Sequence, residues 1–304
     1  MTSSGAFLAG GLAGGPAQAR GTKPGVTSAG APMRIGTVAL TVRDLDTVSR
    51  FYQQVIGLTP IETGAGLARL GVGETVLLEL RHDPAAPLAS PRAAGLFHTA
   101  FLLPNRTDLA QWLLNAAEQR VPLQGASDHL VSEAIYLADP EGNGIEVYWD
   151  RPSETWAWRD SMVEMATLAL DLNGLVATVK SRDWAGMPAG SLVGHVHLQV
   201  GALEPSDNFY AGLLGFDVVC RYPGATFLSS GGYHHHVGTN IWNSRGAPVR
   251  TGPTTGLADV EIVTDAQTLE TVRSHLSPEQ AADATSTRLP LRDPWGTSVT
   301  VVTR

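Results

Sequence analysis

The feature that most constrains this chain is an internal repeat. A Phe-Tyr pair separated by four residues from a Gly occurs at 51–57 and again at 209–215. Each copy comes after a segment that alternates like a half-buried strand, at 38–42 and 196–200. Self-similarity over this period indicates that one structural unit occurs several times, so the fold is built by pairing copies of that unit.

A second repeat divides each half again. The turn Asp-Pro-x-Gly occurs at 139–142 and at 293–296, and each copy leads into an apolar strand. The helices before these turns are predicted at 108–119 and 267–276. Units one and three are therefore alike, units two and four are alike, and each unit is expected to be a strand, a helix and three further strands.

Composition and charge exclude several classes of protein. The chain has 304 residues, of which 43% are hydrophobic and 16% charged, enough for two ordinary domains with sizeable cores. A net charge of −8 without a basic run argues against nucleic acid or an anionic membrane as partner. Cys220 is the single cysteine, so no intrachain disulfide forms, and a reducing compartment such as the cytoplasm is expected. No apolar stretch is long enough for a membrane span.

The repeats also suggest where the parts of the chain begin and end. Residues 1–32 are rich in Gly, Ala, Ser and Pro and are predicted to be a disordered leader. Residues 33–152 form the first half, with units one and two, and residues 193–304 form the second, with units three and four. Residues 153–192 break the pattern and are predicted to connect the halves.

Period-two alternation assigns the faces of the strands. In unit three, Val196 and Leu198 share the face that must pack on the helix, and His195 and His197 share the other. Glu146 likewise lies opposite the apolar face of its strand. An ionised carboxylate in so apolar a strand is costly unless it is paired or binds a metal. The alternative is an exposed edge strand with this carboxylate in water.

Residues 127–146 carry His129, Tyr136 and Glu146 around the Asp-Pro-x-Gly turn, and this run resembles the signature of the extradiol dioxygenases of the vicinal-oxygen-chelate superfamily. Ser127 departs from it, as one small residue in place of another. The resemblance covers roughly residues 34–304 and is strongest to the branch of bacterial catechol 2,3-dioxygenases. It implies an α+β fold of four βαβββ modules that form two paired-module, cupped-sheet barrels, with a metal inside.

The resemblance implies that metal ligands come early in the first strand and midway in the last strand of a unit. Pairing units two and three would collect His98, His195 and Glu146, the two histidines and one carboxylate of non-haem Fe(II) oxygenases. Fe(II) is therefore the expected cofactor, ahead of Mn(II), Zn(II) or Ni(II). His197 is the alternative to His195, and pairing units one and two would leave at best Glu79 as third ligand.

Further residues are assigned by the same resemblance. His129 and Tyr136 would hydrogen-bond the metal-bound oxygen of a catechol. The run Tyr-His-His-His at 233–236 would supply an acid–base histidine. His236 is the predicted one and His234, on the same face, its alternative, whereas His235 is expected to point the other way.

The predicted activity is extradiol ring cleavage of a catechol, or alternatively of a hydroquinone, with a small aromatic diol and dioxygen (O2) as substrates. Two other functions use the same fold: a glyoxalase-type isomerase or lyase, which usually has two carboxylate ligands, and a small-molecule-binding resistance protein without acid–base residues. The fold alone does not choose among them. A homo-oligomer is compatible with the sequence.

Overall fold

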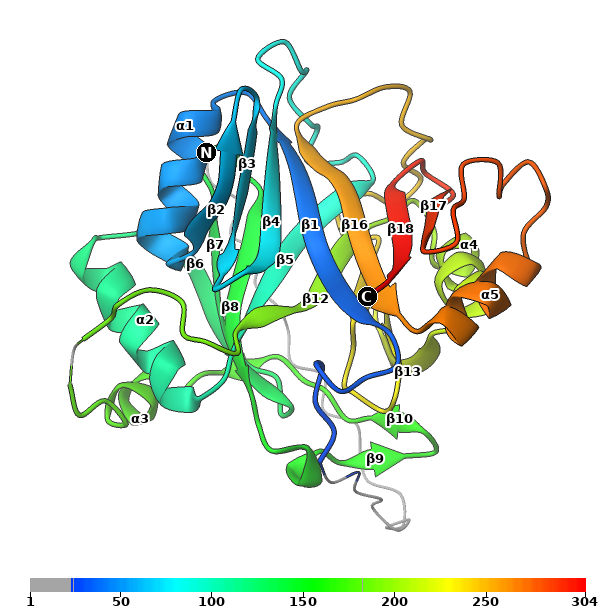
Figure 1. Cartoon of the computed structure of the whole chain (residues 1–304). Coiled ribbons are helices and arrows are strands. Elements are labelled where there is room, and N and C mark those ends of the chain that lie inside the picture. The colour runs from blue at the N-terminus through cyan, green and yellow to red at the C-terminus, as the bar shows by residue number, and fades with distance from the viewer. Residues whose placement is uncertain (1–22, 24, 182) are drawn as a thin grey trace.

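The computed structural model of the chain describes residues 23, 25–181 and 183–304, whose strands form two large sheets (Figure 1). The strands of the first half and connector are β1 (Arg34–Val42), β2 (Thr59–Gly64), β3 (Leu67–Val72), β4 (Thr75–His82), β5 (Gly95–Leu103), β6 (Leu123–Asp128), β7 (Ser132–Ala138), β8 (Gly144–Asp150), β9 (Trp158–Arg159), β10 (Met162–Val163) and β11 (Leu168–Ala169). Those of the second half are β12 (Leu192–Gln199), β13 (Asp217–Tyr222), β14 (Ala225–Ser229), β15 (Val237–Asn240), β16 (Gly256–Thr264), β17 (Arg288–Arg292) and β18 (Ser298–Thr303). The helices are α1 (Leu45–Phe51), α2 (Arg106–Glu118), α3 (Leu172–Val176), α4 (Leu203–Asp207) and α5 (Ala266–Ser274), with π-helical turns η1 (Tyr52–Ile56) and η3 (Asn208–Leu213) and a 3-10 turn η2 (Ser153–Thr155).

Each sheet combines one unit from each half of the chain. The seven-stranded sheet has the order β17-β18-β16-β1-β4-β3-β2, and its middle is the antiparallel pair of β1 with β16. The nine-stranded sheet has the order β11-β6-β7-β8-β5-β12-β15-β14-β13, and β5 pairs antiparallel with β12 in its middle. Units one and four therefore share one sheet, and units two and three share the other. This confirms the predicted α+β fold of paired modules, although unit four has two strands after its helix, β17 and β18, instead of the predicted three.

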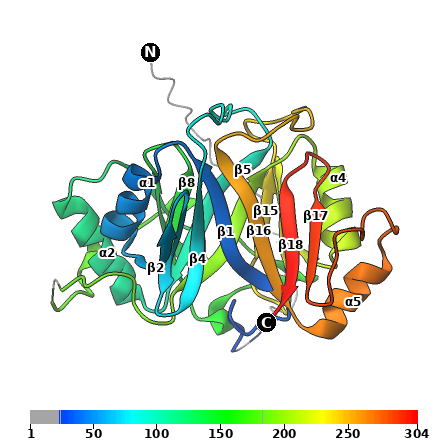
Figure 2. The ribbon, with the colours of Figure 1, turned by 45° about the horizontal axis from the view of Figure 1, so that its top comes forward.

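The apolar faces of the two sheets pack on each other. Val38, Leu40, Val196 and Leu198 all belong to one continuous buried core, as the strand alternation predicts. Across the core, β1 lies against β12 and β16 against β5. Helices α1 and α2 flank one side of the stacked sheets and α4 and α5 the other (Figure 2). The polar face of each sheet consequently looks away from the core.

Both repeated motifs have a structural reason. The glycines that end the Phe-Tyr motifs, Gly57 and Gly215, have φ of +89° and +86°, a region that side chains rarely adopt. The tyrosine of each Phe-Tyr pair then meets the aspartate of the Asp-Pro-x-Gly turn in the next unit. Tyr52 Oη donates to Asp139 Oδ2 at 3.4 Å in the first half. Tyr210 repeats the contact with Asp293 at 3.3 Å in the second. Each buried pair thus ties one sheet to the other.

Local capping explains where the helices begin. Asp44 accepts from Thr47 N at the start of α1, and Asp265 accepts from Thr268 N at the start of α5. A capping box between Asn105 and Asp108 begins α2. As a result, α2 begins two residues before its predicted start, and α5 one residue before.

The segments outside the repeats are more ordered than predicted. The connector holds β11, which extends the nine-stranded sheet, and the β9–β10 hairpin. The end of the expected leader is packed: Val26 N donates to Ser153 Oγ at 3.0 Å, and the buried Ser28 donates to Gly194 O at 3.3 Å. The rest of that leader, residues 1–22 and 24, lies outside the described residues. Within the described part of the chain, no helix has the length and apolarity of a membrane span.

The close parallel pairing of β5 with β8 leads to a stability prediction. A Cβ on Gly144 would lie 2.0 Å from the backbone oxygen of Phe97 and 3.2 Å from the His98 Cβ. We expect Gly144→Ala to lower the free energy of unfolding by about 1–3 kcal/mol, because backbone cannot give way easily. Gly125→Ala is the matched control in β6, where nothing lies within 4 Å of the new Cβ, and it should change stability by less than about 0.5 kcal/mol. Equal midpoints of thermal unfolding for the two variants would contradict the prediction.

Candidate metal centre

Three strands in the middle of the nine-stranded sheet bring His98, Glu146 and His195 together. These residues lie on β5, β8 and β12, which are neighbours in the order β8-β5-β12. One potential ligand atom of each lies within 4.8 Å of the others, and among the described residues no other group of three His, Cys, Asp or Glu does so. Glu146 Oε2 lies 3.0 Å from His98 Nε2 and 3.2 Å from His195 Nε2.

The electrostatics of this group fit a bound cation. Burial by itself would raise the pKa of Glu146, but the neighbouring imidazoles of His195 and His98 hold it well below its usual range. Burial lowers the pKa of His195, which favours its neutral form. A buried carboxylate beside two imidazoles presents several lone pairs to one point. His195 Nδ1 also lacks a hydrogen-bond partner. These residues therefore suit a divalent transition metal.

His195 rather than His197 completes the group. Both rings lie on the cavity face of β12, as the alternation predicts. His197 lies opposite His98 in the β5–β12 register, and their ring centroids are 5.0 Å apart, but it contributes no atom to the cluster. Its ring instead packs against Phe97 and Trp242 at 5.2 and 5.3 Å.

His129 and Tyr136 form a pair beside Glu146. Tyr136 is the direct neighbour of Glu146 in the β7–β8 register. His129 Nδ1 lies 2.7 Å from the carbonyl oxygen of Ala166, which can only accept, so Nδ1 carries the proton in the neutral ring. Nε2 is then the acceptor for the Tyr136 hydroxyl, 2.6 Å away. Burial, and then the charge of Glu146, raise the pKa of Tyr136 well above its usual value, which keeps this hydroxyl protonated.

The three adjacent histidines are oriented differently from the prediction. His235, expected to point away, lines the cavity, and its ring centroid lies 4.0 Å from that of His195. His236 and His234 do not line it. His236 is fully buried, its Nδ1 accepts from Ser230 N at 3.3 Å, and burial lowers its pKa to about 3. The prediction that His236 faces the cavity is therefore wrong.

A chain of hydrogen bonds behind the cavity was missed by sequence reasoning. His234 Nε2 lies 2.7 Å from Asp150 Oδ1, and His234 Nδ1 lies 2.8 Å from His235 Nδ1. Tyr233 donates to the same carboxylate at 2.7 Å, and its hydroxyl lies 2.8 Å from that of Tyr148. The one signal in the sequence was Tyr148, which shares a strand face with Glu146. Together these contacts fix the orientation of His235.

The metal-ligand candidates open into a cavity of about 900 Å³. His98, His129, Tyr136, Glu146, His195 and His235 all line it, together with apolar and aromatic side chains. This volume exceeds that of a bare aromatic diol and is within the range of small-molecule sites.

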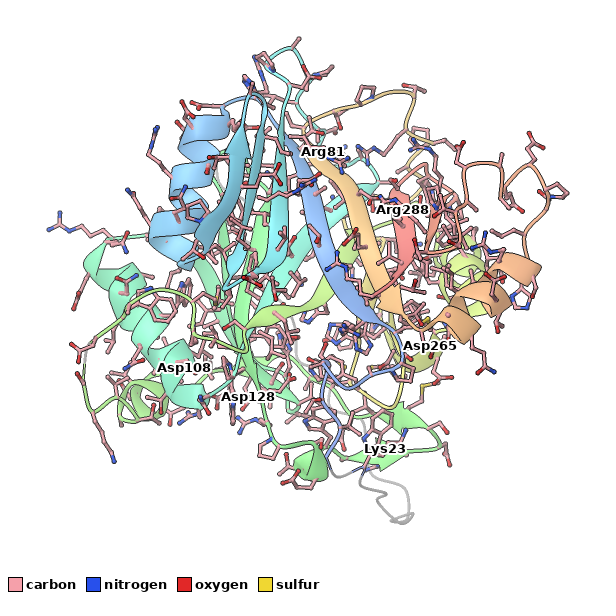
Figure 3. All side chains as sticks on the ribbon, in the orientation of Figure 1. Lys23, Arg81, Asp108, Asp128, Asp265 and Arg288 are labelled. Atoms are coloured by element: carbon pink, nitrogen blue, oxygen red, sulfur yellow. The ribbon has the colours of Figure 1, made fainter. Side chains whose placement is uncertain are left out.

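The equivalent face of the other sheet carries ion pairs instead. Glu79 lies 2.7 Å from both Arg69 Nε and Arg81 Nε, and Asp259 accepts from the Thr300 hydroxyl at 3.0 Å. Arg81 on β4 and Arg288 on β17, both labelled in Figure 3, come from strands on either side of the central pair β1 and β16. The smaller cavity here has a volume of about 330 Å³. Its carboxylates are neutralised by guanidinium groups, so Glu79 is not available as a metal ligand.

The contrast between the two sheets leads to a binding prediction. We expect the protein to bind one equivalent of a divalent transition metal, and Glu146→Gln to lower its affinity at least tenfold because the anionic ligand is lost. Glu79→Gln should leave metal affinity unchanged. Metal content after equilibrium dialysis measures both. An unchanged affinity in Glu146→Gln, or a loss in Glu79→Gln, would contradict this assignment.

Comparison with known proteins is consistent with the fold. Residues 34–147 match the Glyoxalase/Bleomycin resistance protein/Dioxygenase superfamily. A Catechol-2,3-dioxygenase of Bacillus subtilis (strain 168) is 41% identical over 237 residues, covering 76% of this chain and 83% of that protein. Biphenyl-2,3-diol 1,2-dioxygenase 3 of Rhodococcus globerulus is 29% identical over 124 residues, 38% of this chain and 63% of that protein. The crystal structure of glyoxalase I from Zea mays shares the fold, with a TM-score of 0.54, 16% identity and coverage of 89% and 92% of the two chains. The chain belongs to the glyoxalase/bleomycin resistance/dioxygenase superfamily.

Proposed function

We propose that this protein is an Fe(II)-dependent extradiol dioxygenase that cleaves the ring of a catechol. The observation that carries the proposal is the convergence of His98, His195 and Glu146 at the base of a cavity that His129, Tyr136 and His235 also line. The 41% identity to a Catechol-2,3-dioxygenase supports the same reaction class.

The ligand set favours iron over the metals of isomerases on this fold. Two histidines and one carboxylate form the facial triad of non-haem Fe(II) oxygenases, which leaves positions open for substrates. A ferrous ion bound here would supply the redox chemistry that couples the diol to O2. Among the described residues, no second carboxylate joins the cluster, in contrast to the two expected of a glyoxalase-type site.

The protein residues around the triad would orient the diol and handle its protons. The Tyr136 hydroxyl donates to His129 Nε2. This hydrogen bond holds the hydroxyl beside Glu146, where a diol oxygen would lie. His129 can take up a proton that the diol releases, passed through this hydroxyl. His235 lies against His195 and lines the same cavity, and burial holds its pKa well below the usual value, so its neutral ring is placed to hydrogen-bond the reacting oxygen and to take up a proton there.

Oxygen uptake tests the proposal directly. Protein loaded anaerobically with Fe(II) should consume O2 with catechol and form a yellow ring-cleavage product, and Glu146→Ala should abolish both. The same protein loaded with Zn(II) is the control and should consume no oxygen. No uptake across a panel of catechols and hydroquinones, despite bound iron, would exclude a dioxygenase. Turnover of a non-aromatic substrate without oxygen would instead indicate an isomerase.

The histidine run gives a second test of the mechanism. We expect His235→Gln to lower kcat for catechol cleavage by about 10²–10⁴, the usual contribution of a positioned acid or base. His236→Gln should lower it less than tenfold, because this ring is buried away from the cavity. Steady-state oxygen uptake measures both variants at equal iron content. A large loss in His236→Gln with little change in His235→Gln would restore His236 as the acid–base residue.

A further inference from the structure

One arginine lies in the part of the cavity away from the metal-ligand candidates. Arg250 is half-buried, lines the cavity, and uses Nη1 and Nη2 to donate to Leu257 O at 3.2 Å and to the Thr254 hydroxyl at 3.4 Å. No carboxylate of the described residues lies within ion-pair distance of its guanidinium, unlike the arginines of the other cavity, which have such partners. It is also the only Lys or Arg among the lining residues. A guanidinium has five donors in a planar fork that matches a carboxylate, so most of its capacity is unused.

The strand register places this guanidinium on the cavity face. Phe97 is an extra residue at a bulge in β5, because His98 lies opposite His197 while Leu96 lies opposite Leu198. Gly95, opposite Gln199, therefore shares the cavity face with His98. An ideal Cβ on Gly95 would lie 3.9 Å from Arg250 Nη1.

This register also gives the separation from the metal ligands. Because Phe97 is the extra residue, the stretch from Gly95 to His98 matches the two strand residues from Gln199 to His197, or about 7 Å along the sheet. That distance corresponds to an aromatic ring with a short chain beyond it. The wall between them is aromatic: Phe97 and His197 both pack on Trp242, with ring centroids 5.6 and 5.3 Å apart.

The side-chain oxygen of Gln199 faces the same part of the cavity and has no hydrogen-bond partner. Gln199 is 7% exposed, follows His195 and His197 on the cavity face of β12, and lines the cavity. Its Nε2 donates to Ala93 O at 3.4 Å, but its Oε1 has no hydrogen-bond partner. An unmet buried acceptor costs free energy unless a ligand meets it. Besides Glu146, the acidic residue that lines the cavity is Glu141, and its carboxylate already accepts from the backbone N–H groups of Arg43 and Asp44.

We propose that the substrate is a catechol with a short side chain that ends in a carboxylate, bound by Arg250. This rests on the proposed ring cleavage, with the diol at the metal and the side chain along the wall between Gly95 and Gln199. Gln199 accepts from an N–H or O–H group on that chain. A substrate of this length accounts for the volume of the cavity.

Anaerobic calorimetry on the Fe(II) protein tests the proposal with 3-(3,4-dihydroxyphenyl)propionate and its methyl ester, which differ in the charge. We expect wild type to bind the acid at least about tenfold more tightly than the ester, from a charge-assisted pair. Arg250→Gln should remove this preference, and the matched control Arg245→Gln, an exposed arginine outside the cavity lining, should keep it. Equal affinity of wild type for acid and ester, or a preference that survives in Arg250→Gln, would overturn the proposal.

Two further measurements keep the outcomes distinct. If Arg250→Gln does not fold, Arg250→Lys replaces it, and an acid preference equal to that of wild type would contradict recognition by the planar fork. Oxygen uptake with unsubstituted catechol is scored separately. Uptake without an acid preference overturns the carboxylate site and leaves the dioxygenase standing. A lost preference in Arg250→Gln without any uptake supports the anion site and overturns the dioxygenase.

Discussion

The antiparallel pairing of β5 with β12 is the interaction on which the rest of the structure depends. It joins a unit from the first half of the chain to a unit from the second, so neither half contains the site by itself. His98 comes from one strand of this pair and His195 from the other, and β8 adds Glu146 from the adjacent position. A slip of one residue would turn one histidine into the apolar core. The two register shifts in this pair, between Val193 and His195 and between His197 and Leu198, are therefore needed to keep the site intact.

The burial of Glu146 places an electrostatic constraint on the same strands. A carboxylate at 2% exposure needs a positive charge or a full set of donors. The sheet supplies two imidazoles, and desolvation lowers the pKa of His195, which favours its neutral form. The arrangement is thus incomplete as a purely protein structure. The opposite holds at Glu79, where Arg69 and Arg81 supply the charge.

The sequence was sufficient for the fold because its repeats have a physical origin. The glycines at 57 and 215 need positive φ, and Tyr52 and Tyr210 each need the aspartate one unit further on. Alternation also placed His195, His197 and Glu146 on the cavity face, because these residues lie in regular strands. It failed for the histidine run because residues 231–236 form turns and bends before β15 begins. Gly231 and Gly232 both have positive φ, so period two does not apply there. The choice between His195 and His197 likewise depended on the register of β12 against β5, which no pattern in one strand contains.

The two cups of the molecule show how one architecture can be specialised. Glu146 on β8 and Glu79 on β4 occupy equivalent positions of the two sheets, and Asp259 on β16 occupies the position of His195 on β12. In the sheet of units one and four, arginines from β3, β4 and β17 close the cup with ion pairs. In the sheet of units two and three, Tyr136 stands in the position of Arg69, histidines rather than arginines lie beside Glu146, and the cup stays open. Guanidinium groups are always charged, whereas buried imidazoles are neutral donors of lone pairs. The presence of imidazoles in place of guanidinium groups therefore distinguishes the cup that can hold a metal and a substrate from the structural cup.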